Sequence, residues 1–240
     1  MMRLLPGGTE GGRSMAALEL EDPQPELFHI VPAIPVAVDP PAYRIAKRAI
    51  DIIGASLALL MALPLMIVTA IVIKLESAGA VFFHHTRLGQ GGEPFEFYKF
   101  RSMCQEAVVL RAALDGMNEV SGPVFKIRKD PRITAVGRIL RKMSVDELPQ
   151  LWHVLAGRMS LVGPRPPVPD EVARYEPWML QRLAVKPGLT CIWQVSGRSD
   201  IGFGEWMRLD VEYVRNRSLW LDLKILARTI PAVLTGRGAY

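Results

Sequence analysis

The sequence is poor in the residues that bind metal ions or cross-link small secreted proteins. It contains two cysteines and four histidines in 240 residues. The cysteines, Cys104 and Cys191, form no Cys-x-x-Cys pair, and the histidines show no ligand spacing. This composition excludes a disulfide framework and a structural zinc site. We therefore expect two reduced thiols in a cytoplasmic compartment.

A secretory signal is also lacking. Residues 1–43 have neither the basic start nor the apolar run of a signal peptide. They hold two basic residues, six acidic residues and seven prolines, without a sustained helical or strand period. Segments of this composition bury too little apolar surface to fold. We expect residues 1–43 to form a flexible, acidic, Pro/Gly-rich leader.

Charged residues are absent from one long apolar segment, residues 52–73. A helix of these 22 residues is about 33 Å long, which is enough to cross the hydrocarbon core of a membrane. Uncharged runs of this length are rare in soluble cores, so a buried core helix is the weaker alternative. Residues 44–75 are therefore expected to form a membrane segment in contact with phospholipid.

Two features of this segment favour a re-entrant helix over a straight span. Pro64 lies near the middle, where it removes a backbone hydrogen bond and breaks or kinks a helix. Both flanks are basic, and basic flanks favour the cytoplasmic side. A helix–break–helix that enters and leaves by one face satisfies both flanks, whereas a true span does not. Lys47, Arg48 and Lys74 would then lie at the anionic headgroups.

Two short β-prone runs follow, at residues 81–83 and 95–98. The second continues into Lys99 and Arg101, which strand alternation places on one face. A one-sided cationic strand suits contact with phosphate or headgroups, and a solvated edge strand is the alternative. Helical patterns then occur at residues 105–114 and 133–143.

The segment Ser144-Val-Asp-Glu-Leu-Pro-Gln150 begins a helix directly after these patterns. Ser144 and Glu147 fit the capping box Ser-x-x-Glu. With Asp146 as the cap instead, Pro149 would fall in the tolerated first turn. In either register the helix dipole favours ionised carboxylates and lowers the pKa of Asp146. Pure helix capping is thus one interpretation of this motif.

Catalysis is the other interpretation, because basic residues accompany the two carboxylates. Arg141 lies five residues before Asp146, and Arg165 follows a turn just beyond the helix. Guanidinium groups and free helix N–H groups bind phosphate oxygens, and a carboxylate can attack phosphorus. A hard divalent ion such as Mg²⁺ binds few carboxylates together with substrate phosphates. The motif therefore predicts a diphosphate site.

The C-terminal part combines apolar residues at helical spacing with basic side chains over residues 209–233. With Trp206 and Trp220 as aromatic anchors, this pattern indicates interfacial amphipathic helices, and packing in a soluble core is the alternative. Arg198, in a Ser-Gly-Arg turn, is a further phosphate-binding candidate. A nucleic-acid-binding protein would need an aromatic–basic platform or a recognisable binding helix. Neither is present in the sequence, so no nucleic-acid partner is expected.

Seven motifs then carry a resemblance to a known family. They are Lys47-Arg48 with the apolar run to Ile73, Lys99-Phe-Arg-Ser-Met103, Ser144-Val-Asp-Glu-Leu-Pro-Gln150, Ser160-Leu-Val-Gly-Pro-Arg-Pro166, Lys186-Pro-Gly-Leu-Thr190, Trp193-Gln-Val-Ser-Gly-Arg198 and Trp220-Leu-Asp-Leu-Lys-Ile225. In this order, they make residues 43–240 closely resemble the bacterial sugar transferases, which are monotopic phosphoglycosyl transferases. Cys191 departs from the family pattern, in which glycine is usual.

The resemblance implies an enzyme on the cytoplasmic face of the bacterial inner membrane. Such enzymes transfer a sugar 1-phosphate from a UDP-sugar to undecaprenyl phosphate and release UMP, as the first membrane step of exopolysaccharide, capsule, O-antigen or related glycan assembly. Asp146 would be the nucleophile, forming an aspartyl-phosphosugar intermediate, and would bind the required Mg²⁺. Glu147 would be its partner in the dyad. The phosphate-binding arginines would be Arg141 and Arg165.

The expected fold is α+β and mainly helical. A re-entrant membrane helix, broken at Pro64, would precede a small cytoplasmic catalytic domain at residues 76–240 with short strands and interfacial amphipathic helices. Lys99, Arg101 and Arg198 complete the predicted phosphate-binding set. A non-catalytic membrane scaffold is the alternative, and it leaves the dyad and its arginines without a purpose. The identity of the sugar and the formation of a homo-oligomer stay open.

Overall fold

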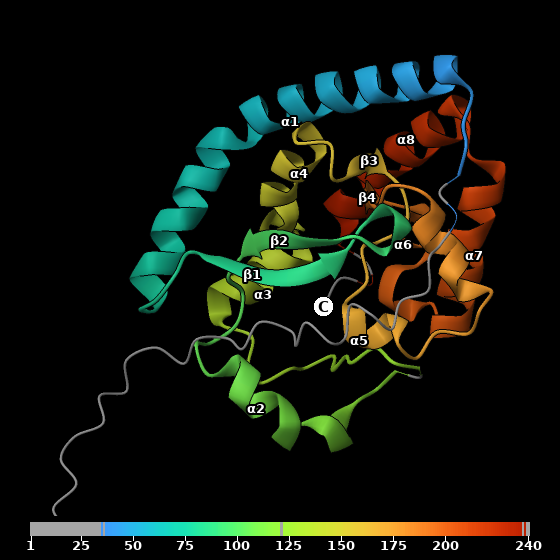
Figure 1. Cartoon of the computed structure of the whole chain (residues 1–240). Helices are drawn as coiled ribbons and strands as arrows, with labels where there is room; N and C mark the ends of the chain where they lie inside the picture. Colours follow the sequence, from blue (N-terminus) through green and yellow to red (C-terminus); the bar gives the residue numbers. More distant parts are fainter. Residues whose placement is uncertain (1–34, 36, 121, 237, 239–240) are drawn as a thin grey trace, which may run out of the picture.

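The computed structural model of the chain describes residues 35, 37–120, 122–236 and 238 (Figure 1). Most of the leader predicted at residues 1–43 lies outside these described residues. Helices make up most of the described chain, and the strands between them are short. The prediction of a mainly helical fold with a few short strands is therefore confirmed.

The apolar segment forms one long helix, α1 (Pro41–Glu76). Pro64 lies inside this helix, and Figure 1 shows α1 as a bent but continuous ribbon over the rest of the molecule. The helix–break–helix predicted at Pro64 is therefore a bend without an interruption. The proline costs one backbone hydrogen bond, while the turns on either side keep theirs. By length and composition α1 could cross a membrane, and only 11% of its most apolar window is buried.

The two β-prone runs pair as an antiparallel hairpin of β1 (Phe82–Leu88) and β2 (Pro94–Phe100). The register places Phe82 opposite Phe100. The turn between the strands, η2 (Gln90–Gly92), requires glycine because its two glycines have φ angles of 72° and 85°. The two predicted strands are therefore confirmed, and each is longer than its sequence pattern indicated.

A second pair of strands, β3 (Ser160–Val162) and β4 (Gly188–Thr190), determines the position of the loop that follows β3. β3 lies parallel to β4. Just beyond β3, the backbones of Gly163 and Gly188 approach so closely that a Cβ on Gly188 would lie 2.0 Å from the Gly163 nitrogen. Only glycine fits at this crossing. The crossing therefore determines where the chain leaves β3 toward Arg165.

Short helices carry the rest of the described chain. In chain order they are α2 (Ala107–Ala113), η3 (Asp115–Met117), α3 (Ala135–Lys142), η4 (Val145–Gln150), α4 (Leu151–Leu155), α5 (Pro169–Val172), η5 (Met179–Ala184), α6 (Ile192–Ser196), η6 (Arg198–Asp200), α7 (Phe203–Asn216) and α8 (Leu219–Thr235). α2 and α3 match the helices predicted at residues 105–114 and 133–143. Thr134 begins α3, because its hydroxyl accepts a hydrogen bond from the Gly137 N–H.

The main hydrophobic core lies among α1, β2, α4, β3 and the two C-terminal helices. Side chains at its centre with an exposed fraction of 2% or less are Ala55, Phe97, Leu151, Val154, Met159, Val162, Tyr213 and Ile225. A smaller cluster joins Ile73 near the end of α1 to Phe100, Leu140 and Val145. Val145 begins η4, so the far end of α1 packs against the element that carries the dyad.

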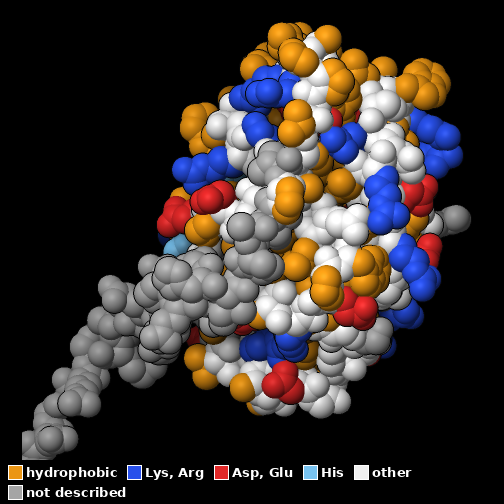
Figure 2. Space-filling view, turned by 45° about the vertical axis from the view of Figure 1, so that its right-hand side comes forward, with side chains coloured by type: hydrophobic (Ala, Val, Ile, Leu, Met, Phe, Trp, Pro, Cys, Tyr) orange, Lys and Arg blue, Asp and Glu red, His pale blue; other side chains and the backbone are white. Residues whose placement is uncertain are grey.

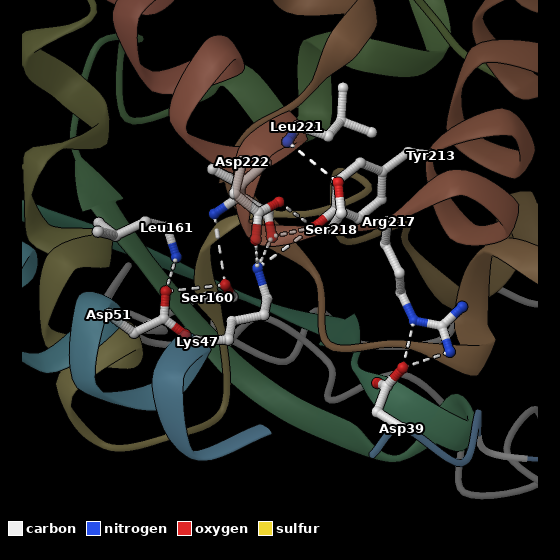
Figure 3. Close-up of polar contacts among 11 residues, drawn as sticks. Asp39, Lys47, Asp51, Ser160, Leu161, Tyr213, Arg217, Ser218, Leu221 and Asp222 are labelled. Carbon is white, nitrogen blue, oxygen red and sulfur yellow. Dashed lines mark hydrogen bonds and ion pairs between the residues drawn. The ribbon is translucent and has the colours of Figure 1, made fainter. Parts of the chain in front are cut away.

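Lys47, on the second turn of α1, is tied to the C-terminal helices (Figure 3). Its Nζ donates to the Asp222 carboxylate at 2.7 Å and to the Tyr213 hydroxyl at 3.2 Å. It also donates to the Val162 carbonyl of β3 at 3.1 Å. The neighbouring Arg48 donates to two carbonyls at the end of α4, at 2.6 and 2.7 Å.

The prediction that Lys47 and Arg48 lie at lipid headgroups is therefore wrong. The carboxylate of Asp222 and the carbonyls at the end of α4 offer these cations hydrogen bonds within the protein. Lys74, the third cation of that prediction, donates to the Gly79 carbonyl just beyond α1.

Asp51 makes a second polar attachment between α1 and β3 (Figure 3). Its carboxylate is 4% exposed and accepts hydrogen bonds from Ser160 Oγ and the Leu161 N–H, both at 2.9 Å. Gly54 lets the two elements approach, because a Cβ there would lie 2.7 Å from the Leu161 side chain. α1 is thus fixed to the strand that leads to Arg165.

Exposed apolar side chains gather on α1 and α8. Figure 2 shows hydrophobic side chains beside lysines and arginines at the top of the molecule, the end that carries α1 and α8 in Figure 1. Trp220, on α8, is 76% exposed, as an interfacial anchor requires. The same prediction is wrong for Trp206, whose ring packs against Trp193 and Phe203 inside the fold. Its helix, α7, presents that position to a neighbouring helix.

Candidate active site

The carboxylate dyad lies on η4, a 3-10 helix that follows α3 after a sharp turn. Ser144 makes this turn in the left-handed conformation, with φ 56° and ψ 22°, and its side chain caps no helix N–H. Asp146 lies within η4 and accepts no capping hydrogen bond either. Both predicted capping registers are therefore wrong. A left-handed residue points its side chain away from the N–H groups that a capping residue of extended conformation would reach.

Asp146 is the buried, unpaired member of the dyad. Its side chain is 6% exposed, and no hydrogen-bond donor or ion-pair partner lies within reach of it among the described residues. Burial raises the pKa of Asp146, and the charge of Glu147 raises it further, against the effects of Lys99, Arg141 and Arg165. The predicted lowering of this pKa by a helix dipole is wrong, because desolvation dominates and no α-helix begins here.

Glu147 is the paired member of the dyad. Burial raises its pKa, but the charge and hydrogen bond of Arg165, together with the charges of Lys99 and Arg198, hold the pKa below its ordinary value. Arg165 Nη1 donates to Glu147 Oε1 at 2.8 Å, and the two groups form an ion pair. Adjacent carboxylates thus have opposite electrostatic environments: Glu147 is ionised in its pair, and Asp146 keeps its lone pairs free.

Two further predicted cations lie within electrostatic reach of the dyad. Arg141, at the end of α3, donates from Nε to Ser102 Oγ at 2.9 Å and interacts with the charge of Asp146. The pKa of Lys99 is lowered to about 8, first by burial and next by repulsion from Arg141, against the attraction of Asp146. The Lys99 Nζ has no hydrogen-bond partner in the described chain and lies 5.4 Å from the centre of the Phe83 ring.

The structure gives Arg101 a different contact from the one predicted. It lies one residue beyond β2, where strand alternation no longer orients side chains. Its guanidinium donates to Ser77 Oγ at 3.0 Å and to the Ser77 carbonyl at 2.8 Å, and also to the Ala78 carbonyl. The carbonyls that follow a helix have no partner within it, so Arg101 closes the end of α1.

Arg198 belongs to the same neighbourhood as the dyad. Burial lowers its pKa and the charge of Glu147 raises it, so the two charges interact. Two further cations, Arg87 and Lys126, also lie near the dyad, although the sequence analysis did not predict them there. The pKa of Arg87 is lowered to about 10 and that of Lys126 to about 8, in each case first by burial and next by repulsion from Arg165.

Only a weak signal for these two cations is present in the sequence. Arg87 precedes the glycine-rich turn of the hairpin, and Lys126 lies in a mixed basic stretch. Neither position reveals that its side chain reaches η4. Arg87 donates to the Pro166 carbonyl at 3.0 Å and lies over the Phe97 ring, 5.3 Å from its centre. Its position thus depends on the pairing of β1 with β2 and on the loop after β3.

The donor set suits a hard divalent cation held jointly with a substrate. No group of three or more His, Cys, Asp and Glu side chains that could hold a metal occurs in the described parts of the chain. Asp146 offers one free carboxylate. Mg²⁺ binds one or two carboxylates and otherwise phosphate and water oxygens, so the residues fit Mg²⁺ but not a site built from protein ligands alone. Surrounding cations also favour phosphate oxygens.

Comparison with known proteins gives consistent similarities. The family described as bacterial sugar transferase matches residues 42–236. The chain is 42% identical to Exopolysaccharide production protein ExoY of Rhizobium meliloti, over 81% of this chain and 88% of that protein. It is 45% identical to Undecaprenyl-phosphate galactose phosphotransferase of Salmonella typhimurium, over 82% of this chain and 42% of that protein. It is 40% identical to UDP-glucose:undecaprenyl-phosphate glucose-1-phosphate transferase of Caulobacter vibrioides, over 91% of this chain and 80% of that protein.

The relatives differ in how much of their own length the chain covers. The chain spans 88% of the exopolysaccharide production protein but less than half of the galactose phosphotransferase. The matched region contains α1 and the dyad together with all six cations near it. Cys191, the departure from the family pattern, has φ −155° and ψ 174°, an extended conformation that any residue adopts.

Proposed function

Because the chain belongs to the bacterial sugar transferase family, we propose that it transfers a sugar 1-phosphate from a UDP-sugar to undecaprenyl phosphate and releases UMP. The predicted family and the transferase class are confirmed. The names of two relatives support undecaprenyl phosphate as the acceptor, and one of them supports a UDP-sugar as the donor. The name of a third supports a place in exopolysaccharide synthesis.

The free carboxylate of Asp146 carries the chemical part of this proposal. A nucleophile needs a lone pair that no donor occupies, and Glu147 is already paired with Arg165 at 2.8 Å. Asp146 is unpaired, poorly solvated and within reach of the charges of Lys99, Arg141 and Arg165. Those cations stabilise the negative charge that develops on phosphate oxygens during attack. The arrangement supports Asp146 as the nucleophile and Glu147 as the group that orients Arg165.

The proposed reaction has two half-reactions. An Asp146 carboxylate oxygen attacks the sugar-bearing phosphorus, the bond from that phosphorus to the bridging oxygen breaks, and UMP leaves with the electron pair. A phosphate oxygen of undecaprenyl phosphate then attacks the same phosphorus. The bond to Asp146 breaks, and the carboxylate is regenerated. This sequence predicts ping-pong kinetics and a covalent aspartyl-phosphosugar.

Mg²⁺ and the membrane complete the proposal. Asp146 would hold Mg²⁺ together with the substrate phosphates, and the ion would supply charge neutralisation. The exposed apolar side chains of α1 and α8 support association with a phospholipid membrane, where the acceptor resides. We place the protein at the bacterial inner membrane with its active site on the cytoplasmic face, since nucleotide sugars are made in the cytoplasm.

Replacing Asp146 by asparagine tests the nucleophile. Asp146→Asn keeps the size of the side chain and removes the attacking oxygen. We expect a folded protein with UMP release reduced at least about 1,000-fold. Wild-type protein incubated with a UDP-sugar alone should gain the mass of one sugar phosphate on the peptide that contains Asp146. A panel of UDP-sugars in the same assay identifies the donor.

Asp115→Asn is the matched control, because it removes an exposed carboxylate whose ion-pair partner among the described residues is Arg111. It should leave UMP release unchanged. If Asp146→Asn keeps substantial turnover, or if the adduct is found on another peptide, Asp146 is not the nucleophile. If the wild type releases no UMP with any UDP-sugar and undecaprenyl phosphate, the proposed activity itself is wrong.

A further inference from the structure

Arg182, on η5, is a fully buried arginine that the proposed reaction does not use. Its side chain and that of its ion-pair partner Asp210 are both 0% exposed. Nε and Nη2 of Arg182 donate to Asp210 Oδ2 at 3.0 and 2.7 Å, and Nη1 donates to the Tyr175 hydroxyl at 2.8 Å. A buried guanidinium needs a counter-charge and a full set of acceptors. Asp210 and Tyr175 supply most of this set.

The remaining contact of Arg182 leads to the dyad. Nη2 donates to the main-chain carbonyl of Arg165 at 2.7 Å. Arg165 in turn donates from its side chain to Glu147 at 2.8 Å. A continuous series of hydrogen bonds therefore runs from Asp210 on α7, through Arg182 and Arg165, to the carboxylate beside Asp146.

The loop that carries Arg165 has little support of its own. It reads Pro164-Arg165-Pro166-Pro167, so three of its four residues lack an N–H donor. Instead, its four carbonyls accept hydrogen bonds from three distant parts of the chain: β1, η5 and β4. The donors to carbonyls 164, 165, 166 and 167 are, in order, Gly188 N, Arg182 Nη2, Arg87 Nη1 and Leu88 N.

We propose that Arg182 is a positioning residue that holds the main chain of Arg165 so that its guanidinium reaches Glu147 and the substrate phosphates. Asp210 orients the guanidinium of Arg182 for this contact. Both side chains are sealed from solvent, so neither can touch a substrate. The role of Arg165 in binding phosphate rests on the proposed function, whereas the attachment of the loop to Arg182 does not.

Arg182→Lys tests this role, because lysine keeps the charge but has one nitrogen in place of the planar fork that spans Asp210 and the Arg165 carbonyl. We expect kcat/KM for UMP release to fall about ten- to hundred-fold, the effect of losing one charge-assisted hydrogen bond. In the variant Arg165→Lys, kcat/KM for UMP release should fall by a similar factor. Combining the two should cost clearly less than the product of the single losses, because both act through the same contact.

Hydrogen exchange gives a readout that does not depend on activity. Three residues of the loop are prolines without an amide hydrogen, so the readout comes from residues 160–163, whose hydrogen-bonded amides lead into it. These amides should exchange slowly in the wild type and faster in Arg182→Lys, while those of α4 stay unchanged. Arg217→Lys is the matched control, since Arg217 pairs with Asp39 at 2.6 Å and makes no hydrogen bond with residues 160–168 in the described structure. It should leave both the exchange of residues 160–163 and kcat/KM at the wild-type values.

Asp210→Asn serves as a second variant if Arg182→Lys does not fold, and the same acceleration of exchange is expected. Multiplicative losses in the double variant would overturn the proposal, and so would lost activity without faster exchange of residues 160–163. Rapid exchange of residues 160–163 in the wild type would overturn it without any variant. Absence of UMP release by the wild type would instead count against the proposed function, and the exchange experiment would still decide the role of Arg182.

Discussion

The partly buried lysine near the dyad, Lys99, predicts a loss of donor binding above neutral pH. The pKa of Lys99 is lowered to about 8 by burial and by Arg141. A lysine is cationic below its pKa, so Lys99 is about nine-tenths charged at pH 7 and about one-tenth charged at pH 9. If a charged Lys99 binds the donor diphosphate, kcat/KM should fall about ten-fold between these pH values.

The enzyme–substrate complex should behave differently from the free enzyme. A bound diphosphate places negative charge near Lys99, and an opposite charge raises the pKa of a lysine. The pH profile of kcat/KM reports the free enzyme, and that of kcat reports the complex. We therefore expect the alkaline fall of kcat/KM to be centred near pH 8 and that of kcat to lie at higher pH.

Arginine substitutions identify the titrating group, because arginine stays charged throughout this range. Lys126 has a pKa lowered to about 8 as well, so Lys99→Arg should reduce the alkaline fall and Lys99→Arg/Lys126→Arg should remove it. Lys142→Arg, on the exposed side of α3, is the matched control and should keep the full fall. An unchanged alkaline fall in the double variant would refute the assignment of this titration to these two lysines.

Two further predictions concern contacts of α1. Arg101→Gln should lower the free energy of unfolding by about 1–3 kcal/mol, because it leaves carbonyls at the end of α1 without a donor, and should change the KM for the UDP-sugar less than two-fold. Thermal unfolding and UMP release measure the two effects, and a ten-fold rise in KM would restore a phosphate-binding role. Asp51→Ala should destabilise by about 2–4 kcal/mol, since two buried donors lose their acceptor, and Asp51→Asn by less. Equal melting temperatures for the wild type and Asp51→Ala would contradict this attachment.

Local patterns in the sequence identified the elements that depend on neighbouring residues. Short runs of β-prone residues located both strands of the hairpin, and helical patterns located α2 and α3, because these signals lie within a few neighbouring residues. The uncharged run likewise identified α1. The motif at residues 144–150 located the dyad but gave the wrong local geometry. A capping box requires an extended first residue, whereas Ser144 is left-handed in the structure.

Contacts between distant segments could not be predicted in the same way. Arg87, Lys99, Arg141 and Arg165 come from four segments, and their convergence depends on the hairpin and on the crossing at Gly163 and Gly188. The sequence also predicted the wrong location for Lys47, because a basic residue beside an apolar run suits a headgroup as well as a buried carboxylate. Asp222, its partner, lies 175 residues away.

The pKa values of the dyad also depend on contacts between distant segments, so local sequence did not predict them. They explain how two adjacent carboxylates can differ in role. Sequence adjacency gives Asp146 and Glu147 equal access to a helix dipole and to both arginines. The loop after β3 removes that equality by directing Arg165 to Glu147, which lowers the pKa of Glu147, while Asp146 is left buried without a donor and its pKa rises. A paired carboxylate is a poor nucleophile because its lone pairs are engaged, whereas an unpaired and poorly solvated one is reactive once cations stabilise the phosphate that it attacks. The position of one main-chain carbonyl, that of Arg165, therefore helps to decide which of the two carboxylates is free to react.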